Sequence, residues 1–363
     1  MSSHPRTLVT KLRLGNAIPP SSAWASRVRK VATRELHGSL FPNWRLGTRV
    51  FGSFLVCLTL AATTHADDEL PNARPVPRMQ VLPLPLDQAA VTRDGNEISR
   101  YYFSQQAKRP FLYPLIGPSG RSLTRMGHPR DPNSHSHHNS VWISHHDVGG
   151  VSFWGDAGGA KIVQKRVVQY EDSADEALIQ VQNAWIDDSG KTLLDEVRTL
   201  RFRPQTDGEW LCVIDLELST KTAATLGKTP FGLVGVRMAK TIGVHDGGGR
   251  ILNSNGERDE KDVFWKRAKW CDYSGPITPT AREGITLFDH PQNPNHPTVF
   301  HVRGDGWMGT SLTHDAPRTI EPEKPVKLRY GLWVHNGVPG REVIEKAFGA
   351  FVEQVGEVAA GKK

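Results

Sequence analysis

The chain has 363 residues, a length that allows one large domain or two of ordinary size. Its formal net charge of +7 would suit a nucleic-acid partner, but residues 1–66 hold nine Lys and Arg side chains against one acid. The other 36 basic and 37 acidic side chains nearly cancel, so composition argues against a protein that binds nucleic-acid phosphates.

Residues 1–66 are predicted to be a leader with a signal peptide. The uncharged run 51–64 follows Arg45 and Arg49, and acidic residues begin directly after Ala66. A positive flank, a short apolar core and a small residue before the cleavage point are typical of a secretory signal, and this core is too short to span a bilayer. We expect export to the periplasm or the extracellular space, with no integral membrane span in the mature chain. An uncleaved membrane anchor is the alternative.

Residues 78–358 are predicted to form a single β-sandwich domain. Apolar residues recur with a period of two, as on the Cys212 face of segment 209–218, where we expect a buried free thiol. Many short strands between Gly, Pro, Asn and Asp predict an all-β fold, a large antiparallel sandwich. The other strands are expected at 97–103, 109–116, 150–154, 160–170, 177–186, 193–203, 231–239, 249–253, 284–289, 298–303, 307–313 and 325–334.

One segment, 341–356, has a helical period instead. Apolar residues three and four apart predict a C-terminal helix docked against the sandwich. The predicted stripe consists of Val343, Ile344, Ala347, Phe348, Phe351, Val352 and Val355.

A histidine cluster is the most unusual feature of the sequence. Five of the fifteen histidines lie within twelve residues, from His135 to His146. On an extended segment His135 and His137 would point to the same side and His138 to the other. Imidazoles there could transfer protons near neutral pH, could bind one divalent metal ion through His135 and His137, or could serve structure alone.

Tryptophan and arginine residues accompany this cluster in three segments. Trp154 follows the histidines, Trp265 and Arg267 lie in a later run, and Arg237 is expected on the strand face of Phe231, Leu233 and Gly235. An indole can stack on the apolar face of a sugar, and arginine can bind its hydroxyl groups. These residues are predicted to bind the substrate, unless the tryptophans only fill the core.

A proline-rich loop at 289–297 is the third candidate. Its prolines exclude a helix and predict a rigid connection between two strands, with His301 and Arg303 following it. We expect His290 and His296 to take part in catalysis and Asn293 to bind substrate. A purely structural connector is the alternative.

Together these segments resemble one bacterial family of exported proteins. The resemblance rests on RPFLYPLIGPSGRSLTR (109–125), HSHHNSVWISHHDVGGVSFWGD (135–156), FWKRAKWCDYSG (264–275), GITLFDHPQNPNHPTVFHVR (284–303) and LRYGLWVHNG (328–337). The family is often labelled "methane oxygenase PmoA"-like, although such a subunit is a bundle of membrane-spanning helices. In architecture it resembles the supersandwich of galactose-mutarotase-like proteins, which implies a sugar ligand.

These observations favour an exported, carbohydrate-active protein. The first hypothesis is an epimerase, lyase or hydrolase acting on a sugar or oligosaccharide, with catalytic residues His135, His137, His138, His290 and His296. The alternatives are a glycan-binding module without catalysis and a metal enzyme built on the histidine cluster.

Overall fold

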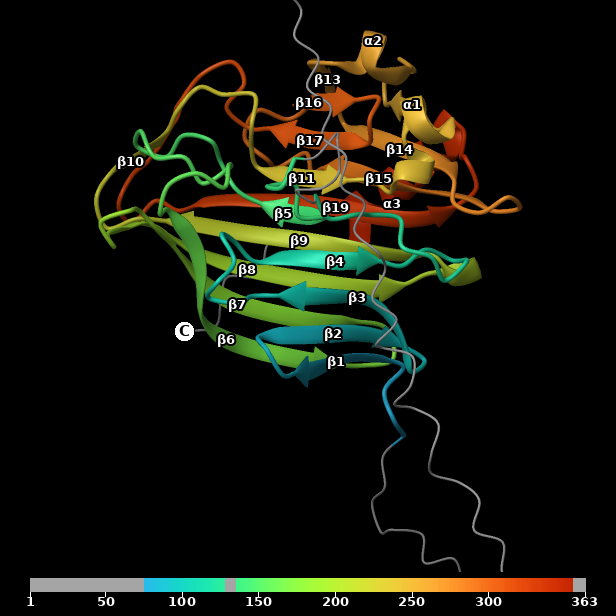
Figure 1. The fold of residues 1–363 in the computed structure, drawn as a ribbon, viewed down its shortest axis with the longest axis horizontal. Helices are drawn as coiled ribbons and strands as arrows, with labels where there is room; N and C mark the ends of the chain where they lie inside the picture. Colours follow the sequence, from blue (N-terminus) through green and yellow to red (C-terminus); the bar gives the residue numbers. More distant parts are fainter. Residues whose placement is uncertain (1–74, 128–134, 355–363) are drawn as a thin grey trace, which may run out of the picture. The chain divides into compact units, whose positions relative to one another are not determined.

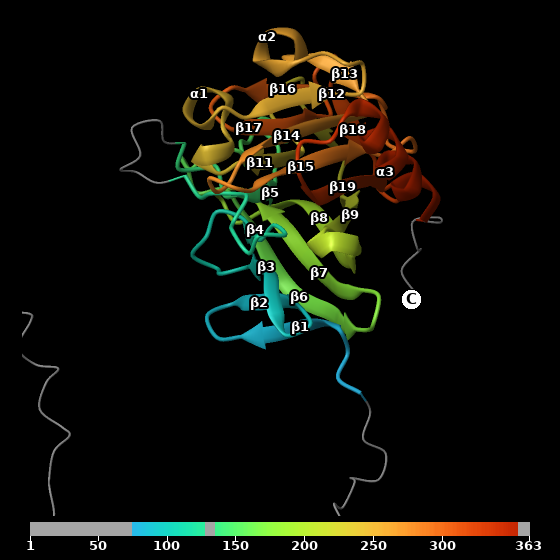
Figure 2. The same cartoon turned by 90° about the vertical axis from the view of Figure 1, so that its right-hand side faces the viewer.

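The computed structural model describes residues 75–127 and 135–354, which form two large antiparallel sheets packed face to face (Figures 1 and 2). The predicted all-β class, with a large antiparallel sandwich and a C-terminal helix, is confirmed. The leader lies outside the described residues and stays a prediction. Within the described ranges, no helix is both long and apolar enough to cross a membrane.

The first sheet has nine strands. Short connections join neighbouring strands at its β1 edge, whereas strands distant in sequence meet at its centre. Its order is β1 (Met79–Leu84), β2 (Gln88–Arg93), β3 (Asn96–Tyr102), β4 (Phe111–Leu115), β5 (Val141–Ile143), β11 (Val234–Arg237), β17 (Trp307–Ser311), β16 (Thr298–Arg303) and β13 (Lys266–Ala268).

The second sheet has eight strands, and a separate pair joins β10 (Ala224–Leu226) to β18 (Arg318–Ile320). Three helices, α1 (Val244–Gly247), α2 (Asp259–Val263) and α3 (Arg341–Gln354), complete the described elements together with two short 3₁₀ turns. The order of the second sheet is β12 (Arg250–Asn253), β14 (Trp270–Pro276), β15 (Arg282–Asp289), β19 (Val326–Asn336), β9 (Trp210–Ser219), β8 (Thr192–Pro204), β7 (Ala177–Ile186) and β6 (Lys161–Asp172).

The main core lies between the two sheets and follows the alternation seen in the sequence. On β9 the even-numbered apolar residues, Cys212 among them, are buried in this core, while Leu211 and Val213 face the other way. Cys212 is a free thiol, as predicted, and so is Cys271 on β14. A strand with both faces buried needs apolar residues at almost every position, which is what β9 has.

Helix α3 covers the outer face of the eight-stranded sheet. Ile344, Phe348 and Phe351 are buried against residues of β9, β12, β14, β15 and β19, so the predicted docking is confirmed. Val343 is 55% exposed and does not belong to the buried stripe. Val355 lies outside the described residues.

Two local predictions are wrong. Segment 150–154 is not a strand: Val151 forms only an isolated bridge with Val148, because two glycines with positive φ turn the chain directly before it. Leu233 does not share a face with Arg237, since β11 begins at Val234 and Leu233 packs in the main core.

Candidate functional site

A row of paired residues crosses the outer face of the nine-stranded sheet. Phe111 of β4 pairs with Trp142 of β5, and Trp142 pairs with Gly235 of β11. Gly235 in turn pairs with Gly309 of β17, which pairs with His301 of β16. Directly opposed residues in a sheet lie on the same face, so strands from five parts of the sequence bring these side chains together.

The two glycines make room for aromatic rings over the sheet. A Cβ atom on Gly235 would lie 2.8 Å from the Trp307 ring and 2.9 Å from the Trp142 ring, and one on Gly309 would lie 2.6 Å from Trp307. Such distances are too short for carbon atoms in contact. The indoles of Trp142 and Trp307, with centroids 5.2 Å apart, therefore lie flat across a strip of bare backbone.

Two loop residues enlarge this aromatic surface. Trp154 packs 5.5 Å from Trp142 and perpendicular to Trp307, and Phe231 lies 5.7 Å from Trp154. Trp142, Trp154 and Trp307 with Phe111 and Phe231 form one cluster, separate from the core between the sheets. We call these five residues the aromatic floor.

The predicted histidines lie on the aromatic floor, but not in the predicted extended form. The backbone N–H of His138 donates to the carbonyl of His135 (2.8 Å), which closes a turn. The His135 ring therefore stacks on that of His138 at 4.6 Å, and the His137 ring lies 4.4 Å from His138. The expected opposite orientation of His138 is wrong, because alternation holds only in extended backbone.

His138 is held between two tryptophans of the floor. Its ring stacks on Trp142 at 5.0 Å and on Trp307 at 4.8 Å. Burial lowers the pKa of His138 far below its usual range, and it lowers the pKa of His137 to about 4. Neutral imidazoles at neutral pH offer one donor and one acceptor each.

Arg109 fixes the loops that carry these side chains. Only 1% exposed, its guanidinium donates to the carbonyl oxygens of His137 (3.0 Å), Trp154 (2.9 Å) and Gly155 (2.8 Å). It also lies 3.6 Å from Asp156, and burial lowers its pKa to about 10. The sequence analysis missed this residue, since nothing near Arg109 indicates that its partners lie some 30 to 45 positions away.

Arg237 anchors the other side of the floor. It is 1% exposed and pairs with Asp305 at 2.8 Å, and its charge helps to keep His137 and His138 neutral. The substrate-binding role predicted for Arg237 stays a prediction.

His301 is a buried histidine enclosed by aromatic rings. It is 6% exposed and lies among Phe231 (5.3 Å), Phe264 (5.2 Å), Trp307 (5.9 Å) and Trp265 (6.5 Å). Neither ring nitrogen has a hydrogen-bond partner among the described residues, and burial lowers the pKa of the ring to about 4. In the same part of the chain, Nδ1 of His138 and Nε1 of Trp142 are two further buried atoms without a partner.

The predicted residues His290, Asn293 and His296 lie in the proline-rich loop at 289–297, which is fixed by hydrogen bonds and ring packing. His296 Nδ1 lies 2.7 Å from an Asp289 carboxylate oxygen, and Asn293 donates to the other oxygen (2.7 Å) and to the carbonyl of Arg329 (2.6 Å). The His290 ring packs 5.5 Å from Phe351 of α3. These contacts fix the chain where it leaves β15 for β16, and the catalytic role predicted for His290 and His296 stays a prediction.

Trp265 lines a separate pocket, and Arg267 pairs with Asp315 of the same lining. Arg267 donates to the carbonyls of Asn295 (3.0 Å) and Pro297 (2.6 Å) and pairs with Asp315. The Trp265 ring lies 5.4 Å from His314. His301 is the side chain that connects Trp265 to the aromatic floor.

No group of three or more His, Cys, Asp or Glu side chains suited to a metal ion is found within residues 75–127 and 135–354. In this part of the chain the His135 and His138 rings are stacked, and the His137 ring meets both of them edge-on. Metal binding through His135 and His137 stays a hypothesis.

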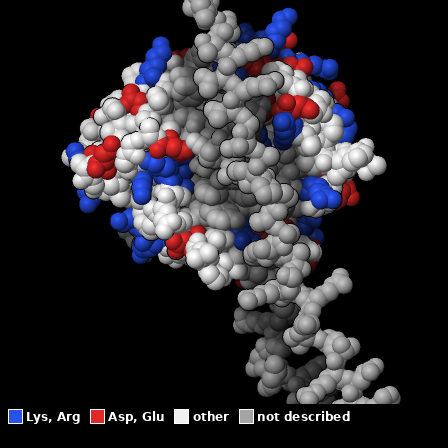
Figure 3. Space-filling model, in the orientation of Figure 1, with Lys and Arg blue, Asp and Glu red and all other residues white. Residues whose placement is uncertain are grey.

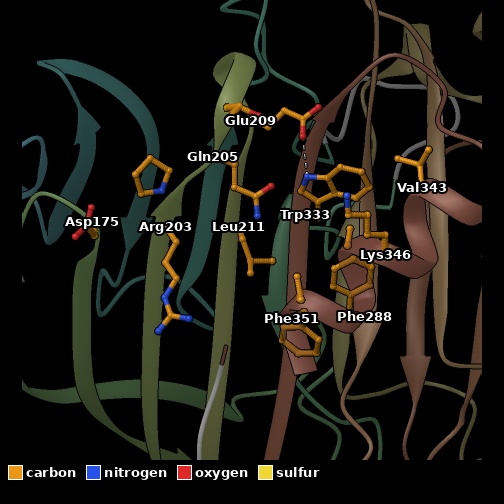
Figure 4. Close-up of a pocket in the computed structure, with 14 residues that line it drawn as sticks. Asp175, Arg203, Gln205, Glu209, Leu211, Phe288, Trp333, Val343, Lys346 and Phe351 are labelled. Atoms are coloured by element: carbon orange, nitrogen blue, oxygen red, sulfur yellow. Dashed lines mark hydrogen bonds between the residues drawn. The ribbon is translucent and has the colours of Figure 1, made fainter. Parts of the chain in front are cut away.

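A second cavity, of about 530 Å³, lies on the other sheet beside α3 (Figure 4). Two of its polar side chains are bound by neighbours: Trp333 Nε1 donates to Glu209 (3.1 Å), and Arg203 pairs with Glu176 (2.7 Å). None of the predicted site residues lines it. We therefore place the candidate site on the aromatic floor.

The distribution of charged side chains gives no reason to expect a nucleic-acid surface on the side of the molecule that Figure 3 shows, as far as its residues are described. Figure 3 shows basic and acidic side chains interspersed among neutral ones on the side towards the viewer. A phosphate backbone would require a continuous basic patch.

Acidification should destabilise the protein through three buried or half-buried histidines, which are His137, His145 and His301. His137, His145 and His301 have folded-state pKa values of about 4, against 6.5 for a free side chain. Between these values the unfolded chain binds more protons, so the free energy of unfolding should fall as the pH drops from about 6.5 to about 4. Urea denaturation across this range measures the slope.

Carboxylates titrate in the same range, so a His301→Phe variant serves as the reference. Its stability relative to the wild type should rise as the pH falls, because it lacks one of the three groups. A difference that does not depend on pH would contradict the proton linkage at His301.

Comparisons with known proteins were made for the sequence and for the structure. The model of a family of unknown function (DUF6807) matches residues 88–349. The comparison with curated proteins finds no match.

Among solved structures, similarities are found to proteins that include sugar epimerases. Galactose 1-epimerase from Lactobacillus acidophilus NCFM is 8% identical, with a TM-score of 0.39, covering 72% of this chain and 100% of that chain. A GalM/aldose epimerase homologue from C. elegans is 7% identical, with a TM-score of 0.33 and coverages of 72% and 99%. At such low scores the similarities carry no argument about activity or substrate.

Proposed function

Because the chain belongs to DUF6807, a family of unknown function, we propose from the site alone that the protein is carbohydrate-active. In this proposal a sugar ring binds on the aromatic floor and exchanges protons with His137. The observation that carries the proposal is the set of buried nitrogens on His138, Trp142 and His301 that have no partner among the described residues and lie next to a cluster of indoles. The predicted leader would place this activity outside the cytoplasm.

Sugar chemistry complements this surface. The C–H face of a pyranose stacks on an indole, and its hydroxyl groups both donate and accept, as unpaired imidazole nitrogens require. A buried polar group without a partner costs about 1–3 kcal/mol, which a bound polyol would offset. Reaching these atoms requires an aromatic ring to rotate, and such side-chain changes are common when a ligand binds.

We assign proton transfer to His137. It is half-buried and neutral, so it can accept a hydroxyl proton at neutral pH. The charge of Asp156 raises the pKa of His137 and would stabilise the imidazolium that forms. This is the acid–base chemistry that epimerases, lyases and hydrolases use. Support for the methane-oxygenase label is lacking, since the matched family is described without an activity.

Proton NMR of mono- and oligosaccharides with catalytic amounts of protein tests the proposal. We expect faster anomeric exchange or a new product, and a His137→Ala variant should abolish turnover while it still binds. His245→Ala, an exposed histidine on α1, is the control and should behave as the wild type. Ligand signals that shift only at stoichiometric protein would instead indicate a glycan-binding module.

The variant His301→Phe should separate stability from binding. Replacing an unsatisfied buried imidazole with an apolar ring of similar shape should leave the free energy of unfolding at neutral pH unchanged or higher. Sugar affinity should fall at least about tenfold, because a hydrogen-bonding group is lost. Urea denaturation and titration calorimetry measure the two effects. If the variant, and also His301→Leu, is strongly destabilised while binding is retained, His301 serves the fold and not the ligand.

A further inference from the structure

Next to His301 lies a pocket that the proposed site does not include. Its volume is about 390 Å³, and it is lined by Lys228, Thr229, Pro230, Trp265, His314 and Asp315. The Trp265 side chain is 47% exposed, whereas the three indoles of the aromatic floor are 6% exposed or less. An indole open to solvent in a pocket is available for stacking on a ligand.

The backbone at Trp265 is held in an unfavourable conformation. Its φ of 58° lies in the left-handed region, which costs a bulky residue about 1–3 kcal/mol. The residue is fixed there by a hydrogen bond from its N–H to the carbonyl of Phe300 (2.9 Å) and by stacking on Phe264 at 4.5 Å. This backbone conformation lowers the free energy of unfolding, but it holds the indole directly before β13, where it lines the pocket.

The pocket has a polar edge beside the indole. One Asp315 carboxylate oxygen lies 2.8 Å from His314 Nδ1 and the other pairs with Arg267, so its orientation is fixed while the side chain stays 55% exposed. Lys228 adds an exposed ammonium group. A stacking face with a carboxylate and an ammonium group at its edge fits a second sugar ring with its hydroxyls.

His301 lies between the two stacking surfaces. Its ring centroid is 5.9 Å from that of Trp307 on one side and 6.5 Å from that of Trp265 on the other. Within the described ranges both of its nitrogens lack partners, although 94% of the residue is buried. A ligand that occupied both surfaces would have to pass this ring.

We propose that the ligand is an oligosaccharide of at least two rings, one on the aromatic floor and the next stacked on Trp265, with His301 binding the atoms between them. This inference rests on the proposed function and specifies its substrate class. It assigns the Trp265 pocket as a second subsite, which accounts for the exposed indole and for the unpaired imidazole with one ligand.

The test compares chain lengths on the full-length protein by titration calorimetry, with glucose, maltose, maltotriose, cellobiose and cellotriose as probes. Affinity in the wild type should rise from the monosaccharide to the disaccharide of a matching linkage. Trp265→Ala should lower disaccharide affinity about tenfold, the effect of one stacking contact, and leave monosaccharide affinity unchanged. Trp265→Phe should retain most of the disaccharide affinity.

Val343→Ala, which truncates an exposed apolar residue of α3 away from both surfaces, is the control and should change neither affinity. Two results would overturn the second subsite and leave the proposed function standing. One is an equal loss of monosaccharide and disaccharide affinity in Trp265→Ala. The other is a wild type that binds glucose and the disaccharides with the same affinity. A wild type that binds no sugar of any length would overturn both.

Discussion

Replacing Arg109 with methionine should lower the free energy of unfolding by about 3–5 kcal/mol, as expected when one partner of a buried charged network is removed. Methionine fills a similar volume but donates no hydrogen bonds. The carbonyl oxygens of His137, Trp154 and Gly155 would then lose their donor inside the protein. Urea denaturation measures the loss of stability.

The same variant should disturb the candidate site, because Arg109 joins the two loops that lie on the aromatic floor. We expect a reduced near-ultraviolet circular dichroism signal from the packed indoles, even at temperatures where the variant is folded. Arg166→Met is the matched control: Arg166 is exposed and donates to the side chain of Gln182, so its loss should cost no more than about 0.5 kcal/mol. An Arg109→Met protein as stable as this control would show that the loops hold their positions without the guanidinium.

The second large effect is expected on the opposite side of the molecule, where Phe351→Ala should cost about 3–5 kcal/mol. Phe351 is 1% exposed, its ring lies 5.4 Å from that of Phe288, and it lies directly over Gly331 of β19. Truncation would leave a cavity between α3 and the eight-stranded sheet, beside the one that Figure 4 shows. Thermal and urea denaturation measure the loss.

Val343→Ala on the same helix is the control, because it distinguishes the stability that comes from packing α3 on the sheet from the stability that comes from helix propensity. Val343 is 55% exposed, so its truncation should change stability by no more than about 0.5 kcal/mol. Similar losses for the two variants would mean that α3 contributes little through its buried face. Neither change should alter sugar binding, since α3 packs on the sheet that does not carry the aromatic floor.

Long regular elements could be predicted from the sequence. The alternation in β9 and β19 and the helical period of α3 each extend over ten or more residues, and the structure confirms these three elements, although Val343 of the predicted stripe is exposed. Strands of three residues, such as β5 and β13, are too short to show a period and were not predicted. Segment 150–154 has the composition of a strand, but the turn before it prevents pairing.

The candidate site was predictable only in part, because it depends on register between distant strands. The sequence drew attention to His135, His137, His138 and Trp154, since they are close together along the chain. It could not show that Trp307 lies on the same floor, because that follows from pairing β17 with β11. Nor could it show that Asn293 and His296 turn inwards onto Asp289, since a polar loop residue looks the same in either role.

The bare glycine strip beneath Trp142 and Trp307 has a consequence for the comparison of sequences. A side chain at Gly235 or Gly309 and a flat indole above it exclude each other, so these positions should vary together across relatives of this chain. A relative that has a larger residue at either glycine would have to replace a tryptophan with something smaller, and its ligand would meet a different surface. The residues at positions 142, 235, 307 and 309, on β5, β11 and β17, could thus be used to group such sequences by the ligand they accept before any of the proteins is purified.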